Sequence, residues 1–431
     1  MNSADYIQLQ NPWWRKDFNL TTLKEYSLKH RFAFSKTQKI LRETKLMLQI
    51  SGLRRLGKST LMKHLILDLI ENQHVDANKV VFCEFSELYN NLESVLQSAP
   101  VQSYLFLDEI QYCRDWKDIL KHYYDIGAAV KIVFSGSATI SYTKNKESLL
   151  GRFMPLKLKP LSFSEYLYLK YGNDENPYLY NQEGLWEFLE YGEFPELLSI
   201  ESQDLKKEYL QKSVLEPLFT QDVLLYDVEK KAEFANLFKV VSSDLGQIIN
   251  KQNIAQEIGI SRAVVDKYLN IFEDLGLVKI IPNYYKSARQ VLGSDKKVYT
   301  ASLNMSLAYL GVRDLKTFPA NYFKGHAFEN FVLNELSQTY DTIYYWKRQQ
   351  KEIDFVAQKE NGQKTAYEVK SKKFVNERET DMYHRYANQA GAELKMVCWD
   401  IENPQGALHK LVLGHRPKTT KRYTGLPFGK K

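Results

Sequence analysis

Cysteine is scarce in this chain of 431 residues, and its three copies, Cys83, Cys113 and Cys398, show no C-x-x-C spacing. This argues against a disulfide framework and against a structural zinc site. Long apolar runs are also missing: no stretch approaches about 18 consecutive apolar residues, so we expect no membrane span. The first residues lack a basic start followed by an apolar run, so we expect no secretory signal and predict a cytoplasmic protein.

Excess charge is nearly absent from most of the chain. The formal net charge is +7, and residues 414–431 contribute +6 of it because they hold six Lys and Arg side chains and no acid. The remaining chain has a net charge of about +1, which does not indicate nucleic-acid binding over its whole surface. The basic tail, residues 416–431, could contact phosphates, and a solvated chain end is an equal alternative.

What the chain does contain is a glycine-bracketed loop between an apolar run and a helical pattern. The apolar run ends at Ile50, and residues 52–59 match G-x-x-x-x-G-K-[ST]. In this context the two glycines let backbone N–H groups wrap a polyphosphate, while Lys58 provides a positive charge and Ser59 an oxygen ligand for Mg²⁺. The sequence therefore predicts a site for ATP at the start of a helix.

Apolar segments that alternate with helical patterns predict an α/β fold with a parallel sheet. The third segment, residues 103–107, is followed by Asp108 and Glu109. Because ligands of such sheets bind beyond the carboxyl ends of the strands, these acids are expected beside the phosphate loop. Asp108 would then hold Mg²⁺ through its water shell, and Glu109 would polarise the attacking water. The alternative is a pair of acids that caps the next helix.

Further residues are candidates for contacts with phosphate. Ser137, just past the fourth segment, could sense the terminal phosphate, although a Ser-Gly-Ser turn is also an ordinary strand end. Arg152 could stabilise the transition state in its own subunit or in a neighbour. Salt bridges are an equal alternative for Arg54, Arg55 and Arg152. The predicted nucleotide-binding residues are Gly52, Leu53, Arg54, Arg55, Leu56, Gly57, Lys58, Ser59, Thr60, Asp108 and Ser137, and the predicted catalytic residues are Lys58, Glu109 and Arg152.

The segments GLRRLGKST, LFLDEIQ, FSGSAT, LLGRF, PLSFSEYL and YGEFPE together resemble the bacterial and archaeal AAA+-type P-loop ATPases. The particular branch that they resemble has a winged helix and a PD-(D/E)xK nuclease-like domain after the ATPase. The resemblance implies an α/β parallel-sheet ATPase core with a helical lid, a winged helix-turn-helix and a C-terminal α/β restriction-endonuclease-like domain. The expected divisions are an N-terminal helical extension (1–44), the ATPase core (45–161), the lid or connector (162–230), the winged helix (231–305), the nuclease-like domain (306–415) and the basic tail (416–431).

Residues 253–274 have the pattern of a helix-turn-helix. Residues 253–258 predict a short helix, Gly259 the turn, and residues 261–274 a longer helix capped by Ser261. In DNA-binding proteins of this kind the second helix enters the major groove. The residues expected on its exposed face are Arg262, Asp266, Lys267, Asn270, Glu273 and Asp274. Because this face is mixed in charge, DNA binding and a packing role are equal alternatives.

A second set of charged residues lies near the C-terminus. A helix predicted over residues 325–336 carries Glu329, and two predicted strands carry Asp354 and then Glu368 and Lys370. They resemble the PD-(D/E)xK pattern, in which carboxylates hold Mg²⁺ at the scissile phosphate and a lysine activates water. The alternative is a hairpin with solvated acids and lysines. The predicted catalytic residues here are Asp354, Glu368 and Lys370, and the predicted metal ligands of the whole chain are Ser59, Asp108, Glu329, Asp354 and Glu368.

The connection between these two strands tests the C-terminal site. Glu368 and Lys370 share one face of their strand, and Asp354 joins that face only if the numbers of opposed residues sum to an even value. A two-residue turn at Asn361-Gly362 would give an odd sum and send Asp354 to the other face. We therefore predict a connection of three or five residues, or a bulge.

The functional prediction is a Mg²⁺-dependent ATPase that controls a DNA-binding C-terminal domain, with DNA cleavage left open. The rival is an ATP-driven switch that binds DNA or a protein partner and cuts nothing. A kinase of small molecules is a third interpretation, which would leave the C-terminal half unexplained. A homo-oligomer is compatible with the sequence and would let Arg152 act in a neighbouring subunit.

Overall fold

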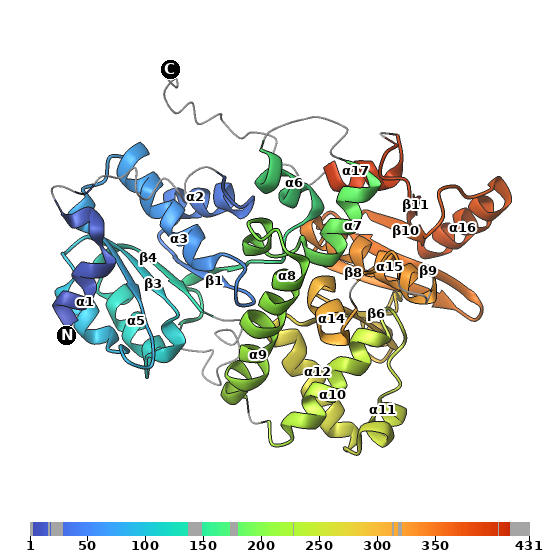
Figure 1. Ribbon diagram of the computed structural model, residues 1–431, viewed down its shortest axis with the longest axis horizontal. Coiled ribbons are helices and arrows are strands. Elements are labelled where there is room, and N and C mark those ends of the chain that lie inside the picture. Colours follow the sequence, from blue (N-terminus) through green and yellow to red (C-terminus); the bar gives the residue numbers. More distant parts are fainter. Residues whose placement is uncertain are drawn as a thin grey trace.

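The computed structural model describes residues 3–15, 18, 29–136, 149–172, 180–226, 228–312, 314–317, 321–403 and 405–413. It shows a sheet with helices at one end, a helical middle, and a second sheet at the other end (Figure 1). Ser137 and the basic tail lie outside the described residues. In the described part of the chain, no helix combines the length and the apolar character that crossing a bilayer requires.

The first region is a five-stranded parallel sheet in the order β2-β3-β4-β1-β5. Its central strand β1 is buried at all five positions, as expected for a strand with both faces covered. The strands are β1 (Met47–Ser51), β2 (Val80–Glu84), β3 (Ser103–Asp108), β4 (Ala129–Ser135) and β5 (Phe153–Lys157). The helices are α1 (Ser3–Gln10), α2 (Ala33–Glu43), α3 (Lys58–Leu67), α4 (Leu92–Ser98) and α5 (Trp116–Asp125). The predicted parallel α/β fold is confirmed.

The middle of the chain is helical. Ser162 begins α6 because its side chain accepts a hydrogen bond from the Glu165 N–H, a typical N-cap. The helices are α6 (Phe163–Tyr171), α7 (Gln182–Tyr191), α8 (Gln203–Tyr209), η10 (Leu210–Leu215), α9 (Glu216–Thr220) and η11 (Asp222–Leu225). The described residues between 162 and 230 are therefore mostly helical.

Five helices and a two-stranded antiparallel hairpin follow. Both helices of the expected helix-turn-helix are present, and Gly259 joins them with a φ of 77°. The elements are α10 (Lys231–Ser243), α11 (Lys251–Ile258), α12 (Arg262–Leu275), β6 (Val278–Pro282), α13 (Ala288–Leu292), β7 (Lys296–Thr300) and α14 (Leu303–Leu310). The end of β6 is fixed to the next region, because Tyr284 N donates to Tyr345 O at 2.7 Å.

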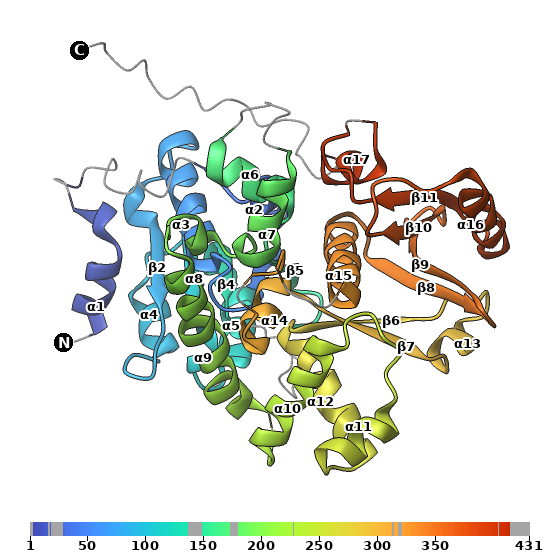
Figure 2. The same ribbon diagram turned by 45° about the vertical axis from the view of Figure 1, so that its right-hand side comes forward.

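The last region has a four-stranded sheet in the order β11-β10-β9-β8. Strands β8, β9 and β10 are antiparallel, whereas β11 pairs parallel to β10. The elements are α15 (Asn321–Thr339), β8 (Thr342–Arg348), β9 (Lys351–Gln358), β10 (Lys364–Lys370), α16 (Glu377–Ala390), β11 (Glu393–Cys398) and α17 (Ala407–Leu413). Figure 2 shows α15 between this sheet and the helical middle.

The hydrophobic cores cross the expected divisions. One cluster joins Leu48 and Phe106 of the first sheet to Phe234 of α10 and Phe272 of α12. A second joins α6 and α7 to α15 and the last sheet. Since apolar burial is the main favourable term in folding, the regions stabilise one another.

Candidate functional site

The backbone of the phosphate loop requires glycine where it passes β5. Gly52 has a φ of 147°, and a Cβ built on it would lie 2.4 Å from Leu158 O. Gly57 has a φ of 85° and precedes Lys58, the first residue of α3. The Lys58 Nζ is buried inside the loop and donates to Leu53 O at 3.1 Å and to Gly52 O at 3.3 Å. The predicted loop therefore has its lysine at the centre and a helix N-terminus behind it.

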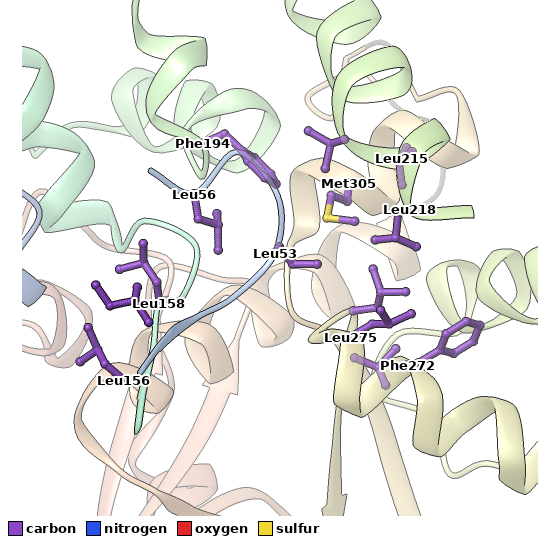
Figure 3. Packing of buried hydrophobic residues seen from close by; sticks show 14 of the residues in the cluster. Leu53, Leu56, Leu156, Leu158, Phe194, Leu215, Leu218, Phe272, Leu275 and Met305 are labelled. Carbon is purple, nitrogen blue, oxygen red and sulfur yellow. The ribbon is translucent and has the colours of Figure 1, made fainter. Parts of the chain in front are cut away.

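The two leucines of the loop, Leu53 and Leu56, pack against an apolar surface and so fix the position of the loop. Leu53 and Leu56 are buried in one cluster with Phe194, Leu218 and Leu275 (Figure 3). These partners come from the helical middle and from the end of α12. The sequence motif does not predict this contact, since the motif fixes only the glycines, the lysine and the serine.

A buried ion pair fixes the loop from the other side. Arg31 Nη1 donates to Leu56 O, and Arg31 Nε lies 2.7 Å from Glu165 Oε1 on α6. Glu165 also accepts a hydrogen bond from Phe32 N at 2.7 Å. Because loss of one partner would leave a buried charge uncompensated, both side chains are needed for this contact.

Arg54 forms the salt bridge that was the alternative to phosphate binding. Its Nη2 lies 2.8 Å from Asp222 Oδ1, and its Nε lies 3.0 Å from both oxygens of Asp222. Burial acts to lower the pKa of Arg54, but the paired Asp222 more than reverses this and keeps the guanidinium charged. Arg55 has a φ of 65° and is exposed.

Asp108 lies at the end of β3 with its carboxyl group buried. Ser135, the last residue of β4, donates to Asp108 Oδ1. Burial raises the pKa of Asp108, and the charge of Glu109 raises it further, whereas the hydroxyls of Ser135 and Ser59 act in the opposite direction. The second oxygen, Oδ2, is buried and accepts no hydrogen bond from any residue that the structure describes.

The chemistry of Asp108 and Ser59 fits Mg²⁺. This cation takes oxygen ligands and prefers one or two protein oxygens together with phosphate oxygens. A buried carboxylate oxygen without a donor, close to a serine hydroxyl, is such a set. Asp108 and Ser59 would therefore hold the ion, which would polarise the terminal phosphate when bound.

Glu109 follows in a left-handed conformation, with a φ of 53°. Such a backbone in a non-glycine residue stores about 1–3 kcal/mol and is concentrated at functional sites. Gln111 Nε2 donates to Glu109 Oε2, which fixes the carboxylate, and Glu109 is only half-buried. Glu109 thus lies next to the buried Asp108 and remains accessible to a water molecule.

Arg152 lies at the opposite end of the sheet from this loop. Met47, the first residue of β1, donates its N–H to Arg152 O at 2.9 Å, whereas the phosphate loop follows the last residue of β1. Five residues of strand, about 3.3 Å each, separate the two ends. The Arg152 guanidinium instead pairs with Asp125, with Nε 2.8 Å from Oδ1. The structure does not bring Arg152 to the loop of its own chain.

The connection between β9 and β10 has three residues, one of the alternatives that the sequence allowed. Tyr367 lies opposite Phe355, so opposed numbers sum to an even value and Asp354 faces Glu368. Lys359 N donates to Gln363 O at 2.9 Å, which leaves residues 360–362 in the connection. Gly362 has a φ of 83°, the left-handed conformation that three-residue hairpins need.

The acids and the lysine of this hairpin contact one another. Lys370 Nζ lies 2.6 Å from Glu368 Oε1, and Asp354 Oδ2 accepts a hydrogen bond from Val369 N at 2.8 Å. Burial and the neighbouring Glu368 raise the pKa of Asp354 well above its ordinary value. Burial likewise raises the pKa of Glu368, and the Lys370 ammonium opposes it.

The carboxylate of Glu329 on α15 contacts side chains of β7 rather than other acids that could share a metal ion. Its Oε1 accepts a hydrogen bond from Tyr299 Oη and lies 3.5 Å from Lys297 Nζ, and its Oε2 lies 3.4 Å from His326 Nδ1. Burial acts to raise the pKa of Glu329, but His326 and Lys297 outweigh it and lower the pKa. In the described ranges, no three His, Cys, Asp or Glu side chains are arranged to hold a metal ion. The three acids nevertheless act on one another, because the charges of Glu368 and Glu329 both raise the pKa of Asp354.

Several residues of these sites were not predicted from the sequence. Asp222 and Arg31 contact the loop from segments far away in the sequence. No sequence pattern around either residue predicts this contact. Ser135, the last residue of β4, contacts Asp108, whereas the sequence pointed to Ser137, which lies outside the described residues. The end of the strand gives a signal for Ser135, because the last residue of a strand still faces its neighbour in the sheet.

Three protein-family models match the chain. One is described as an AAA domain and matches residues 44–167. The other two are described as domains of unknown function, DUF8612 over residues 182–316 and DUF4143 over residues 324–409. An uncharacterized protein of Methanocaldococcus jannaschii is 27% identical over 377 residues, which is 82% of each chain. An uncharacterized protein of Haemophilus influenzae is 24% identical over 336 residues, or 72% of this chain and 79% of the relative.

Similar solved structures include the ORC1 protein of Aeropyrum pernix in complex with DNA and AMPPCP-bound DnaA from Aquifex aeolicus. The first has a TM-score of 0.32 at 14% identity and covers 67% of this chain and 94% of its own. The second has a TM-score of 0.29 at 13% identity and covers 57% and 88%. At these scores the two structures add nothing to the assignment. The match over residues 44–167 and the geometry of the phosphate loop support an AAA-type P-loop domain in this part of the chain, consistent with ATP binding.

Proposed function

We propose that this protein binds and hydrolyses ATP with Mg²⁺ and that its nucleotide state controls the C-terminal half of the chain. The observation that carries the proposal is the convergence of Lys58 and Ser59 with Asp108, whose Oδ2 is buried without a hydrogen bond. This is the arrangement of a positive charge and two oxygen ligands that phosphoryl transfer requires.

The proposed steps belong to the residues of the loop and of β3. Lys58 exchanges its bonds with the carbonyls of Gly52 and Leu53 for the outer phosphate oxygens of ATP. Glu109 accepts a proton from the attacking water, a contribution of about 10²–10⁴-fold for a positioned base. Asp108 stays charged when a cation is bound beside it, since an opposite charge favours the ionised form.

Two routes connect the loop to the C-terminal half. Through Leu56 O, Arg31 and Glu165, the loop contacts α6, and Phe163 N of α6 donates to Glu335 Oε1 on α15 at 2.8 Å. Through Leu53, it packs on the same cluster as the end of α12. A loop that changes shape around ATP would act on both, which supports control rather than an isolated ATPase.

The test of the ATPase uses two variants. We expect Lys58→Ala to abolish ATP binding and Glu109→Gln to keep binding while lowering hydrolysis about 100-fold or more. Binding is measured with a fluorescent ATP analogue and hydrolysis by phosphate release. Normal turnover in Glu109→Gln would overturn the assignment of the base.

A switch without cleavage is the second candidate for the C-terminal half. The observation that favours it is the engagement of Glu329 by Lys297 and Tyr299, together with the lack of a metal-binding trio among the described residues. Incubation of plasmid DNA with Mg²⁺ and ATP separates the two. Cutting that disappears in Glu368→Ala supports a nuclease, and ATP turnover without cutting supports the switch.

DNA and a second copy of the chain are the proposed partners. The exposed residues of α12, Arg262, Lys267, Asn270 and Glu273, are as mixed in charge as expected. A role of Arg152 in hydrolysis requires a neighbouring subunit, because its own loop lies at the other end of the sheet. Sedimentation with and without ATP measures the oligomeric state.

A further inference from the structure

An open cavity lies between the segment after β6, the end of β8 and α16. Its volume is about 340 Å³, and its lining includes Tyr285, Lys286, Trp346, Arg348 and Gln389. The volume falls in the range of small-ligand sites. Figure 2 shows α13, which follows this segment, beside the end of β8. The cavity shares no residue with the phosphate loop or with the acids of the C-terminal hairpin.

Arg348 is the fixed element of this cavity. Its Nη2 donates to Tyr284 O at 2.7 Å and its Nη1 to Asn283 Oδ1 at 3.2 Å. Its guanidinium carbon lies 3.8 Å from the ring centroid of Tyr285. None of these acceptors is a carboxylate, and Arg348 forms no ion pair with any described residue. The contacts therefore hold a cation over an aromatic ring without neutralising its charge.

Three lysines around the cavity also carry a charge that no described carboxylate neutralises. Lys286 lines it and is exposed, Lys364 Nζ lies 5.0 Å from the ring centroid of Tyr284, and Lys351 Nζ lies 5.8 Å from that of Tyr386. None of the three forms an ion pair within the described part of the chain. A group of un-neutralised cations on an otherwise near-neutral body favours an anionic ligand.

An aromatic stripe on α16 extends from the cavity to the hairpin acids. Tyr383, Tyr386 and Gln389 are spaced by three residues and share one helix face. The rings of Tyr383 and Tyr386 lie 5.8 Å apart, and that of Tyr386 lies 6.2 Å from Trp346. At the other end, Lys370 Nζ donates to Tyr383 Oη at 2.9 Å.

We propose that this track, from Lys370 along α16 to Arg348 and Tyr285, binds single-stranded nucleic acid. A base stacks at the Arg348–Tyr285 pair, and Lys286, Lys351 and Lys364 contact phosphates. Alternating aromatic rings and cations are how proteins hold single strands, because every unpaired base offers a π-face. A duplex hides these faces within its own stack. The inference rests on the proposed function only where the strand reaches the Glu368–Lys370 pair, and binding itself needs no cleavage.

The test is fluorescence anisotropy with the full-length protein and a 20-nucleotide fluorescein-labelled oligonucleotide of mixed sequence. EDTA is present and ATP is omitted, so neither hydrolysis nor metal-dependent cutting contributes. We expect Tyr285→Ala to raise the Kd about tenfold or more, since one base stack is lost. Tyr285→Phe keeps the ring and is expected to bind within about twofold of wild type. Leu292→Ala, at an exposed position of α13, is the matched control.

Absence of binding by wild type, or unchanged binding by Tyr285→Ala, overturns the inference. So does a duplex of equal length that binds as tightly, or polyglutamate that displaces the strand as well as unlabelled oligonucleotide does, which would point to an acidic protein segment. Thermal melting of Tyr285→Ala and Tyr285→Phe excludes unfolding as the cause. Strand binding without any ATP turnover refutes the proposed function and leaves this inference standing. ATP turnover without strand binding refutes this inference and leaves the proposed ATPase standing.

Discussion

Gly52 shows how one residue limits the phosphate loop. Its φ of 147° is a conformation that L side chains rarely adopt, and a Cβ there would overlap Leu158 O. Both effects follow from the close approach of the loop to the residue after β5. The loop can therefore wrap a phosphate only if the position has no side chain.

We predict that Gly52→Ala destabilises the protein by about 2–6 kcal/mol, the combined cost of a strained backbone and overpacking, and abolishes ATP binding. Gly151→Ala is the control, because Gly151 also has a positive φ but a Cβ there meets nothing within 4 Å. Its expected cost is about 1 kcal/mol. Thermal melting and nucleotide binding measure both, and equal shifts for the two variants would contradict the contact with Leu158.

For single residues, the sequence predicted the positions that depend on neighbouring residues of the chain. It did not predict contacts between segments that lie far apart in the sequence. The residues of the motif and Asp108 could be placed because glycine spacing and a strand end define them. Asp222 could not be placed, since its contact with Arg54 joins residues 168 positions apart. The two interpretations of Arg54 were equal from sequence because an arginine pairs with a carboxylate as readily as with a phosphate.

Among the elements, the end of α12 packs against the phosphate loop. Leu275, its last residue, is buried in the cluster that contains Leu53. Truncating a buried leucine typically costs about 2–5 kcal/mol. The loss here falls on the surface that supports the loop.

We therefore predict that Leu275→Ala weakens ATP binding as well as stability, although it contacts no nucleotide. The matched variant Leu292→Ala should change neither, because Leu292 is 79% exposed. Titration with a fluorescent ATP analogue, at a temperature where both variants are folded, gives the comparison. Unchanged affinity in Leu275→Ala would mean that α12 supports the fold alone.

The β9–β10 hairpin was the element most fully predictable from sequence. Side-chain alternation has a period of two, so the parity of the register followed from which residues must be buried. The destination of Glu329 was not predictable, because its partners Tyr299 and Lys297 come from β7, on another hairpin. A motif identifies the acidic residues, but it does not predict which other side chains will form hydrogen bonds or ion pairs with them.

Across the whole molecule, α15 joins the helical middle to the last sheet. Glu335 is buried against α6, and Glu329 lies six residues earlier, about 9 Å along the helix. Burial raises the pKa of Glu335 to about 8, and the charge of Lys279 opposes this. The junction between the two halves therefore contains an acid that holds a proton in the folded state.

This predicts a pH dependence of stability. The folded chain binds the Glu335 proton more tightly than the unfolded chain, whose pKa is 4.5, so stability falls as pH rises from about 4.5 to about 8 and this loss ends above 8. Glu335→Gln resembles the protonated form and should weaken the fall. Lys279, whose pKa burial lowers to about 7, acts oppositely between 7 and 10.5 and is present in both proteins. Urea midpoints at pH 5.5 and 8.5 provide the comparison, and equal slopes would exclude Glu335 as the cause.

The central claim is that nucleotide at the phosphate loop controls the C-terminal half, and hydrogen–deuterium exchange across α15 tests it most directly. Exchange is compared with and without ATP and Mg²⁺ in Glu109→Gln, which should hold ATP unhydrolysed, and in Lys58→Ala, which should not bind it. The account predicts that ATP changes exchange in both the loop and residues 321–339 of the first variant and in neither region of the second. Protection of the loop with unchanged exchange throughout α15 would contradict it.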